Sequence, residues 1–178
     1  MLLRELSKVL QDGQEAELST AVNVFSCKDK DVEGFLKTKA FEYERRKKSR
    51  THIAFAEADE LIILAYFTLS IKILTFKQGL SKTLIKRIDG FNKDAKAAPV
   101  FLIGQFGKDA VIGNAVDGSE LMNRCLYDLK QAQKIVGGRT VLAECLPIPA
   151  VIEFYERNGF EFLQRDENDK YLQMIFTL

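Results

Sequence analysis

Apolar residues recur along the chain at two spacings, and each spacing predicts one kind of element. Helical spacing marks residues 32–43, 80–91, 119–136 and 147–158. Short apolar runs typical of buried strands lie at 21–25, 51–57, 60–70, 99–106, 139–146, 161–166 and 170–178. The chain is therefore expected to begin with a strand at AVNVF and then to alternate helices and strands.

Turn and cap residues support these boundaries. Asp117 with Glu120 fits a capping box at the start of the long helix, and Gly137-Gly138 ends it. An Ala-Asp pair at 58–59 joins two strands into a hairpin, whose turn charges are Glu57, Asp59 and Glu60. The order of elements predicts a mixed α/β sheet with parallel crossovers around the two later helices. A length of 178 residues suits one domain, 1–178.

Composition narrows the class of protein. The chain is 47% hydrophobic and 29% charged with a net charge of +1, which is typical of a globular protein without a broad basic surface. Three widely spaced cysteines and a single histidine, His52, favour neither a disulfide framework nor a metal site. No apolar run is long enough to cross a membrane, so a reducing cytoplasm is expected.

Two segments are candidates for binding anions. The first is a basic cluster after the first predicted helix, made of Arg45, Arg46, Lys47, Lys48 and Arg50. It is interpreted either as a solvated helix end, which the helix dipole favours, or as an anion site. The second is the loop 107–118, which carries three glycines and leads into a helix. Its spacing matches no phosphate-binding fingerprint, so a phosphate site and an ordinary connection both stay open.

Tyr155 is the candidate for chemistry in the last helix. At 100° per residue it shares an apolar face with Ile148, Val151, Ile152 and Phe154. A buried phenol needs a hydrogen-bond partner, and a ligand can supply that partner. Tyr155 is therefore either a packing residue or an acid that acts on a bound ligand. His52, in a predicted strand, is interpreted as serving local hydrogen bonds rather than as a base.

Several of these segments together resemble the GNAT acyl-coenzyme A N-acetyltransferases, and most of all the toxin-like branch that acetylates aminoacyl-tRNA. The resemblance covers roughly residues 20–178, and EFYERNGF is its most specific segment. VFSCKDKDVEGFLKTKAFEYERRKKSRTHIAFAE and AYFTLS are similar to the N-terminal half of that branch. The resemblance implies an α/β GNAT fold, with a mixed, mostly antiparallel central sheet and helices on both faces.

The resemblance also implies roles for particular residues, with acetyl-coenzyme A as co-substrate and no metal. Main-chain groups of Phe106, Gly107 and Lys108 would hold the pantetheine and the acetyl carbonyl. Tyr155 would protonate the departing thiolate. The pyrophosphate would lie on the loop and helix start, at Gly113, Asn114, Ala115, Gly118 and Ser119.

The loop departs from the family pattern of Gln or Arg, two residues, Gly, any residue, then Gly or Ala. An ungapped alignment places Val111, Asn114 and Val116 at those positions, and a shift by one residue places Ala110 at the polar one. Side chains at glycine positions can block the approach of a phosphate. A GNAT-fold protein that acts as a non-catalytic binding or regulatory module is therefore the alternative to an enzyme.

No general base stands out, and this bears on the acceptor. An α-amine with a pKa of about 7.7 to 8.0 is largely neutral at cytoplasmic pH, whereas a lysine at about 10.4 is not. An α-amine, such as that of aminoacyl-tRNA, is therefore favoured over a lysine, with a small-molecule amine or a protein N-terminus as alternatives. Candidate partners are the amine acceptor, a ribbon-helix-helix antitoxin and a second copy of the chain in a homodimer.

Overall fold

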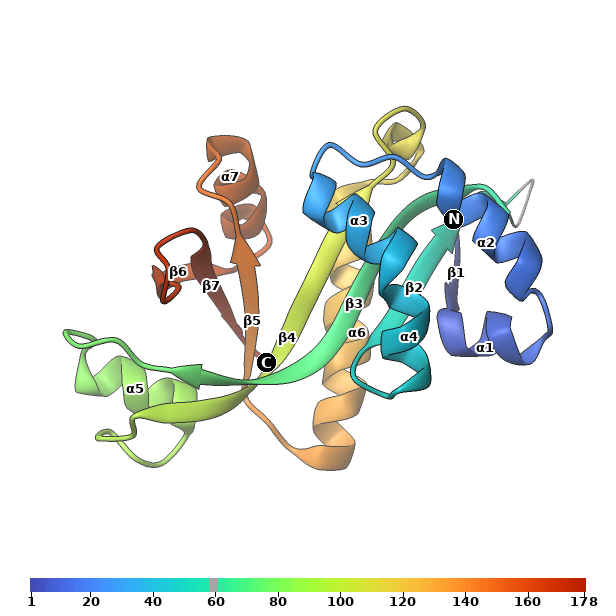
Figure 1. The fold of residues 1–178 in the computed structure, drawn as a ribbon. Helices are drawn as coiled ribbons and strands as arrows, with labels where there is room; N and C mark the ends of the chain where they lie inside the picture. The colour runs from blue at the N-terminus through green and yellow to red at the C-terminus, as the bar shows by residue number, and fades with distance from the viewer. Residues whose placement is uncertain (58–60) are drawn as a thin grey trace. The chain divides into compact units, whose positions relative to one another are not determined.

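The structure is a computed structural model that describes residues 1–57 and 61–178 (Figure 1). The strands are β1 Leu2–Glu5, β2 Arg50–Phe55, β3 Ile63–Thr75, β4 Ala97–Lys108, β5 Thr140–Cys145, β6 Glu161–Arg165 and β7 Leu172–Thr177. The helices are α1 Leu6–Gln11, α2 Glu15–Val24, α3 Lys30–Thr38, α4 Ala40–Arg45, α5 Lys82–Asp89, α6 Gly118–Val136 and α7 Pro149–Arg157. The predicted turn residues Asp59 and Glu60 lie outside the described residues.

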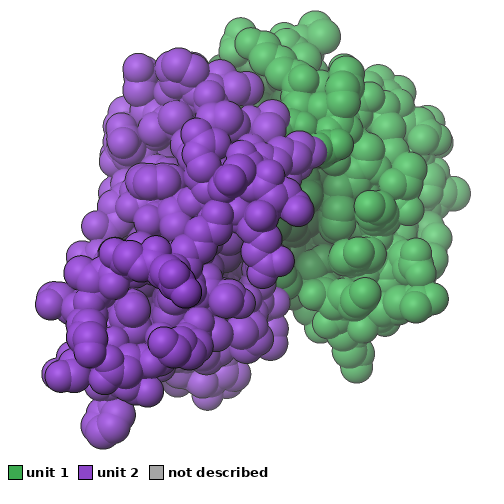
Figure 2. Space-filling model, turned by 60° about the vertical axis from the view of Figure 1, so that its left-hand side comes forward, with its two compact units in different colours: residues 1–70, 104–121 green, residues 71–103, 122–178 purple. Residues whose placement is uncertain are grey.

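The strands form one sheet in the order β1-β2-β3-β4-β5-β7-β6. The chain divides into two compact units, which we describe separately (Figure 2). The first unit holds residues 1–70 and 104–121, and the second holds residues 71–103 and 122–178. The expectation of a single domain stays a prediction.

The prediction of a strand at residues 21–25 is wrong, because this segment is the end of α2. Leu18, Val22 and Phe25 are spaced by four and three residues and are all buried in the same apolar core. A helix places these three side chains on one face, and this packing outweighs the strand propensity of valine and phenylalanine. The helix predicted over 32–43 is also interrupted, at Lys39, where φ is −124° and ψ is −29°.

The first unit is built around β2 and β3, which pair antiparallel as the hairpin pattern predicted. Ile53 and Phe55 alternate along β2 and therefore point to one face, where Tyr66 of β3 joins them in the core. Helices α1 and α4 contact β2, and Figure 1 shows α3 and α4 lying across the strands. The Tyr66 hydroxyl donates to the carbonyl of Val32 in α3, which ties this helix to the sheet.

The second unit confirms the first predicted crossover, because β4 and β5, joined through α6, pair in parallel. The closing hairpin is also present, with β7 antiparallel to both β5 and β6. In β5, the hydroxyl of Thr140 donates to the Ile88 carbonyl of α5, and Leu142 packs in the core that includes Ile88. Cys145 is three residues further along β5 than Leu142 and therefore points to the opposite face, beside Tyr155 of α7. Helices therefore cover both faces of these strands.

The long helix α6 buries most of its predicted apolar face. Leu121, Met122, Cys125 and Leu129 are at most 2% exposed. Val136, which the pattern also assigned to this face, is 72% exposed. Gly137 follows with φ of 76° and ends the helix, so Val136 is the last residue of α6.

The packing of the end of β4 against α3 can be tested at Gly107. A Cβ placed on Gly107 would lie 2.6 Å from Cγ1 of Val32 and 3.1 Å from Sγ of Cys27. We expect Gly107→Ala to lower the free energy of unfolding by about 1–3 kcal/mol, measured by chemical denaturation. Gly34→Ala is the matched control, because a Cβ there meets no atom within 4 Å, and in α3 it should stabilise by about 0.5–1 kcal/mol. Equal stability of the two variants would contradict the packing described here.

Candidate functional site

Tyr155 lies in α7 of the second unit, at the end of the second turn of the helix that Pro149 begins. Its side chain is only 6% exposed. The ring meets Phe154 and Phe160 edge-on, with centroid distances of 5.4 and 5.3 Å. The chain turns sharply after the helix, at Gly159 with φ of 84°, and this turn brings Phe160 back onto the ring. The aromatic contacts therefore determine where the phenol lies.

The Tyr155 hydroxyl has no hydrogen-bond acceptor among residues 1–57 and 61–178. Burial, followed by the neighbouring thiols of Cys145 and Cys125, raises its pKa above the ordinary value of a tyrosine. The phenol therefore keeps its proton throughout the physiological range. A neutral donor with no acceptor in the described chain is suited to a ligand atom that gains negative charge.

The predicted pantetheine-binding residues Phe106, Gly107 and Lys108 end strand β4 in the first unit. The ring of Phe106 stacks with that of Phe67 at 6.5 Å, and Phe67 stacks with His52 at 4.8 Å. His52 thus contributes to an aromatic stack. Gly107 is buried against Val32 and Cys27, so part of the reason for a glycine here is packing.

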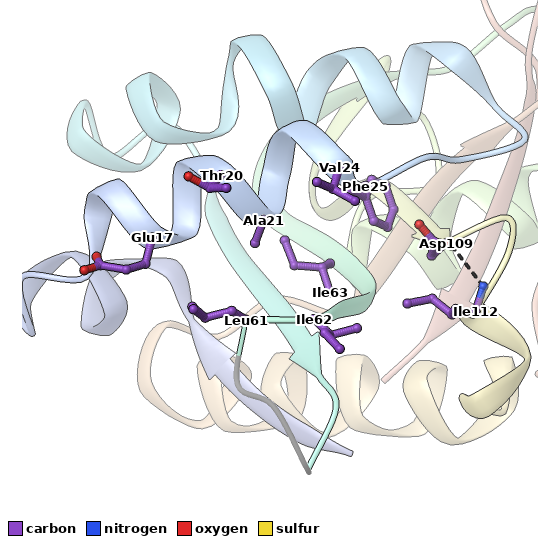
Figure 3. Close-up of a pocket in the computed structure, with 10 residues that line it drawn as sticks. All are labelled: Glu17, Thr20, Ala21, Val24, Phe25, Leu61, Ile62, Ile63, Asp109 and Ile112. Atoms are coloured by element: carbon purple, nitrogen blue, oxygen red, sulfur yellow. Dashed lines mark hydrogen bonds between the residues drawn. The ribbon is translucent and has the colours of Figure 1, made fainter.

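The loop after β4 is organised by Asp109, a residue that the sequence analysis did not single out. Its Oδ1 accepts a hydrogen bond from the backbone N–H of Ile112 at 3.0 Å (Figure 3) and another from that of Val111 at 2.8 Å. Its Oδ2 accepts from the N–H of Ser26 at 3.0 Å. Burial tends to raise the pKa of Asp109, but these three donors outweigh it and the pKa is lowered. An aspartate directly after a strand was the available signal, because such residues often cap the next turn.

Two of the predicted pyrophosphate residues, Gly113 and Ser119, also have internal contacts. Gly113 packs closely, because a Cβ there would lie 2.8 Å from Cβ of Lys108. The N–H of Ser119 donates to Oδ1 of Asp117 at 3.0 Å, which confirms Asp117 as the cap of α6. The ammonium of Lys108 donates to the carbonyl of Val116 at 2.8 Å. Two carboxylates thus occupy three backbone donors of the loop, and these N–H groups are not available to a pyrophosphate.

The basic cluster is largely neutralised by neighbouring side chains. Arg45 pairs with Glu15, Arg46 with Glu42 at 3.0 Å, and Arg50 with Glu44 at 2.6 Å. Lys48 lies over the ring of Tyr43. Lys47 is exposed with a φ of 57°. The cluster therefore presents less positive charge than its sequence indicates, although exposed pairs of this kind are weak and can exchange partners.

Two pockets are present, and neither includes a residue that was predicted for the site, although Asp109 and Ile112 of the loop line the first one. One, of about 440 Å³ in the first unit, is lined mainly by apolar side chains of α2 and by the start of β3 (Figure 3). The other, of about 340 Å³ in the second unit, is polar. There Lys72 pairs with Glu144 at 2.7 Å, Gln173 donates to Glu144 at 2.8 Å, and Gln164 donates to Gln173 at 2.7 Å. These residues are far apart in the sequence, so no local spacing could have indicated the network.

Residues 1–57 and 61–178 contain neither a metal-binding cluster nor a helix that could span a membrane. No group of three or more His, Cys, Asp or Glu side chains there is placed to hold a metal ion. None of the helices in these ranges combines the length and the apolar character that a membrane span requires.

Comparison with known proteins places the fold. No protein-family model and no curated protein matches the sequence. Solved structures do match: AtaT complexed with acetyl-methionyl-tRNAfMet has a TM-score of 0.70 at 21% identity, over 88% of this chain and 86% of that one. A tyrosine-to-phenylalanine variant of KacT has a TM-score of 0.70 at 22% identity, over 88% and 86%. AtaTR bound with AcCoA has a TM-score of 0.68 at 20% identity, over 99% and 92%.

At these identities the likeness shows the fold alone. The chain has the GNAT fold, a mixed sheet with helices on both faces, as the resemblance implied. The site residues stay predictions.

Asp109 generates a test that depends on pH. We expect Asp109→Ala to lower the free energy of unfolding at pH 7 by about 1–3 kcal/mol, because three backbone donors lose their acceptor. A carboxyl with a lowered pKa stabilises the fold above its unfolded pKa of about 3.9 and loses this contribution as the pH falls through its folded pKa. The deficit should therefore shrink below about pH 4 in urea titrations.

The exposed residue Glu153 on α7 supplies the control for this test. Glu153→Ala should change stability by less than about 0.5 kcal/mol at either pH. A deficit in Asp109→Ala that is the same at pH 7 and pH 3 would contradict the role of the carboxylate.

Proposed function

We propose that the protein is an N-acetyltransferase that moves an acetyl group from an acetyl-coenzyme A thioester to a primary amine. The observation that carries the proposal is the hydroxyl of the largely buried Tyr155, which has no described acceptor and lies on the helix where the GNAT family places its acid. The GNAT fold, shared with structures that bind AcCoA, supports it. The acetyl-binding strand end at Phe106, Gly107 and Lys108 is part of the same proposal.

In the proposed reaction the amine nitrogen forms a bond to the acyl carbon while the carbon–sulfur bond breaks. A backbone N–H near Gly107 or Lys108 would hold the carbonyl oxygen as it gains charge. Tyr155 would give its proton to the departing sulfur. The proton released by the new amide nitrogen passes to solvent, and solvent restores the phenol.

The raised pKa of Tyr155 bears on this proton transfer. An ordinary thiol has a pKa of about 8.5, which would make donation from the phenol unfavourable in water. Burial raises the pKa of the neighbouring Cys145 thiol to about 11. A thiolate departing into similar surroundings would also be a stronger base than in water. Burial therefore raises the pKa of a leaving thiol as well as that of the phenol.

For the acceptor we propose an α-amine, and specifically that of aminoacyl-tRNA. The solved AtaT structure is complexed with acetyl-methionyl-tRNAfMet, and others hold the C-terminus of the antitoxin AtaR. By analogy, an antitoxin of the ribbon-helix-helix type and a homodimer are proposed for this chain, in the cytoplasm where tRNA is found. The basic cluster would contact phosphates of the acceptor stem once its ion pairs exchange.

A second candidate function is favoured by Asp109. Because the loop amides hold a carboxylate of the protein itself, the fold can also be that of a GNAT-like module that binds a partner without catalysis. Calorimetry with acetyl-coenzyme A separates the two candidates. Tight binding excludes the module, whereas no binding of any pantetheine thioester at millimolar concentration excludes the enzyme.

The role of Tyr155 has a direct test. We expect Tyr155→Phe to lower kcat by about 10²- to 10⁴-fold, because the ring contacts remain while the proton donor is lost. Donor binding by calorimetry and the melting temperature should change little. Tyr127→Phe is the control, since Tyr127 is 55% exposed on α6 and should keep full activity. An unchanged kcat in Tyr155→Phe would show that the hydroxyl takes no part in catalysis.

The acceptor is tested by reversing charge in the basic cluster. We expect the double change Arg46→Glu and Lys47→Glu to raise KM for aminoacyl-tRNA by at least about tenfold, because phosphate contacts are lost. KM for the acetyl donor should stay constant. Lys93→Glu, at an exposed position in the linker before β4, is the control for a general charge effect. An unchanged KM for tRNA would contradict this acceptor surface.

A further inference from the structure

The chemistry of the loop between β4 and α6 indicates which part of an acyl donor this protein recognises. We infer that the donor is recognised through its acylated pantetheine arm, without a favourable contribution from the adenosine diphosphate. Pantetheine thioesters that lack this group, either free or attached to a carrier protein, would then serve as donors as well as acetyl-coenzyme A does. The inference rests on the proposed transferase function and specifies its donor.

The first reason is that the loop already holds an anion. Phosphates bind at loops of this kind through backbone N–H groups that point at the ligand. Here the N–H groups of Val111 and Ile112 point at Oδ1 of Asp109. The same carboxylate also holds Ser26, a distant part of the chain, so a phosphate would have to break a contact on which the loop conformation depends.

The second reason is charge. Residues 107–119 contain two carboxylates, Asp109 and Asp117, and one cation, Lys108. Asp117 caps the start of α6, where the helix dipole would otherwise attract an anion. The Lys108 ammonium is engaged with the Val116 carbonyl inside the loop. A pyrophosphate would therefore meet a segment of net negative charge, with its single cation already in use.

The third reason is the residue at the position of the family's polar phosphate ligand. Val111 stands where the family pattern has Gln or Arg, and its side chain is 80% exposed. A valine offers no donor to an anion. By contrast, the groups proposed for the thioester end do not depend on this loop: the hydroxyl of Tyr155 is on α7, and the backbone of Gly107 belongs to β4.

The test compares donors on the intact protein with one amine acceptor. The arms are acetyl-coenzyme A, S-acetylpantetheine and acetylated acyl carrier protein, and the readout is kcat/KM for each donor. We expect kcat/KM for acetyl-coenzyme A and kcat/KM for S-acetylpantetheine to agree within about tenfold. The adenosine diphosphate would have no subsite to bind, so it would not stabilise the transition state. A higher kcat/KM with the acetylated carrier protein than with S-acetylpantetheine would identify the carrier protein as the acyl donor. Equal values would identify a free pantetheine thioester as the donor.

Two other outcomes overturn the inference in different ways. A preference for acetyl-coenzyme A of more than about 100-fold, as expected where several charge-assisted hydrogen bonds hold the pyrophosphate, refutes it and leaves the transferase function standing. A lack of reaction and of binding with all three donors overturns the proposed function, and this inference with it.

A gain-of-function variant examines the structural reason. Val111→Arg restores a cation at the exposed position, and Asp117→Asn keeps a capping side chain while it removes a negative charge. Together they should raise the ratio of kcat/KM for acetyl-coenzyme A over S-acetylpantetheine by about tenfold or more. Ile135→Arg, 83% exposed at the end of α6, is the control and should leave the ratio unchanged. An unchanged ratio in the double variant would show that the loop does not face the adenosine diphosphate, and would refute the argument.

Discussion

The carboxylate of Asp109 is the interaction on which the arrangement of the first unit depends. It holds the N–H of Ser26, before α3, and the N–H groups of Val111 and Ile112, before α6. Around it, the N–H of Asp109 donates to the Leu64 carbonyl of β3, and that of Ala110 donates to the Ser26 carbonyl. A single residue therefore joins the end of β4 to β3 and to the segment that follows α2.

This junction explains why the neighbouring residues are small. With β4 held against the segment at Ser26, Gly107 is pressed onto Cys27 and Val32. With the loop turned back by Asp109, Gly113 lies against Lys108 and the Leu64 carbonyl. Glycines that resemble remnants of a phosphate loop are thus required by local packing as well. Their presence alone does not argue for a bound pyrophosphate, and this is why the hydrogen bonds of the loop carry more weight than its composition.

The sequence predicted the fold more fully than the site. Strands with continuous apolar runs and helices with clear stop signals were found, because burial and capping act over a few neighbouring residues. The strand prediction for AVNVF was wrong because the residue propensities favour a strand, whereas packing with Leu18 requires a helix. The sequence did not predict the hydrogen bonds of Asp109 or the network of Lys72, Glu144 and Gln173. Each of them joins segments that are distant in the chain. The neutralised basic cluster was missed for a similar reason, since Glu15 pairs with Arg45 from another helix.

The position of Tyr155 follows from packing, whatever the protein does. Its ring meets Phe154 and Phe160 edge-on, and Phe160 in turn lies 5.4 Å from Phe176 of β7, so the aromatic cluster anchors α7 to the sheet. A phenylalanine would make the same ring contacts. A phenol adds only a hydroxyl, and within the described chain that hydroxyl has no acceptor. A donor without a protein acceptor adds no hydrogen bond to the stability of the fold. The hydroxyl is therefore the part of Tyr155 that packing does not explain, and a ligand that arrives with an electron-rich sulfur would give it a partner.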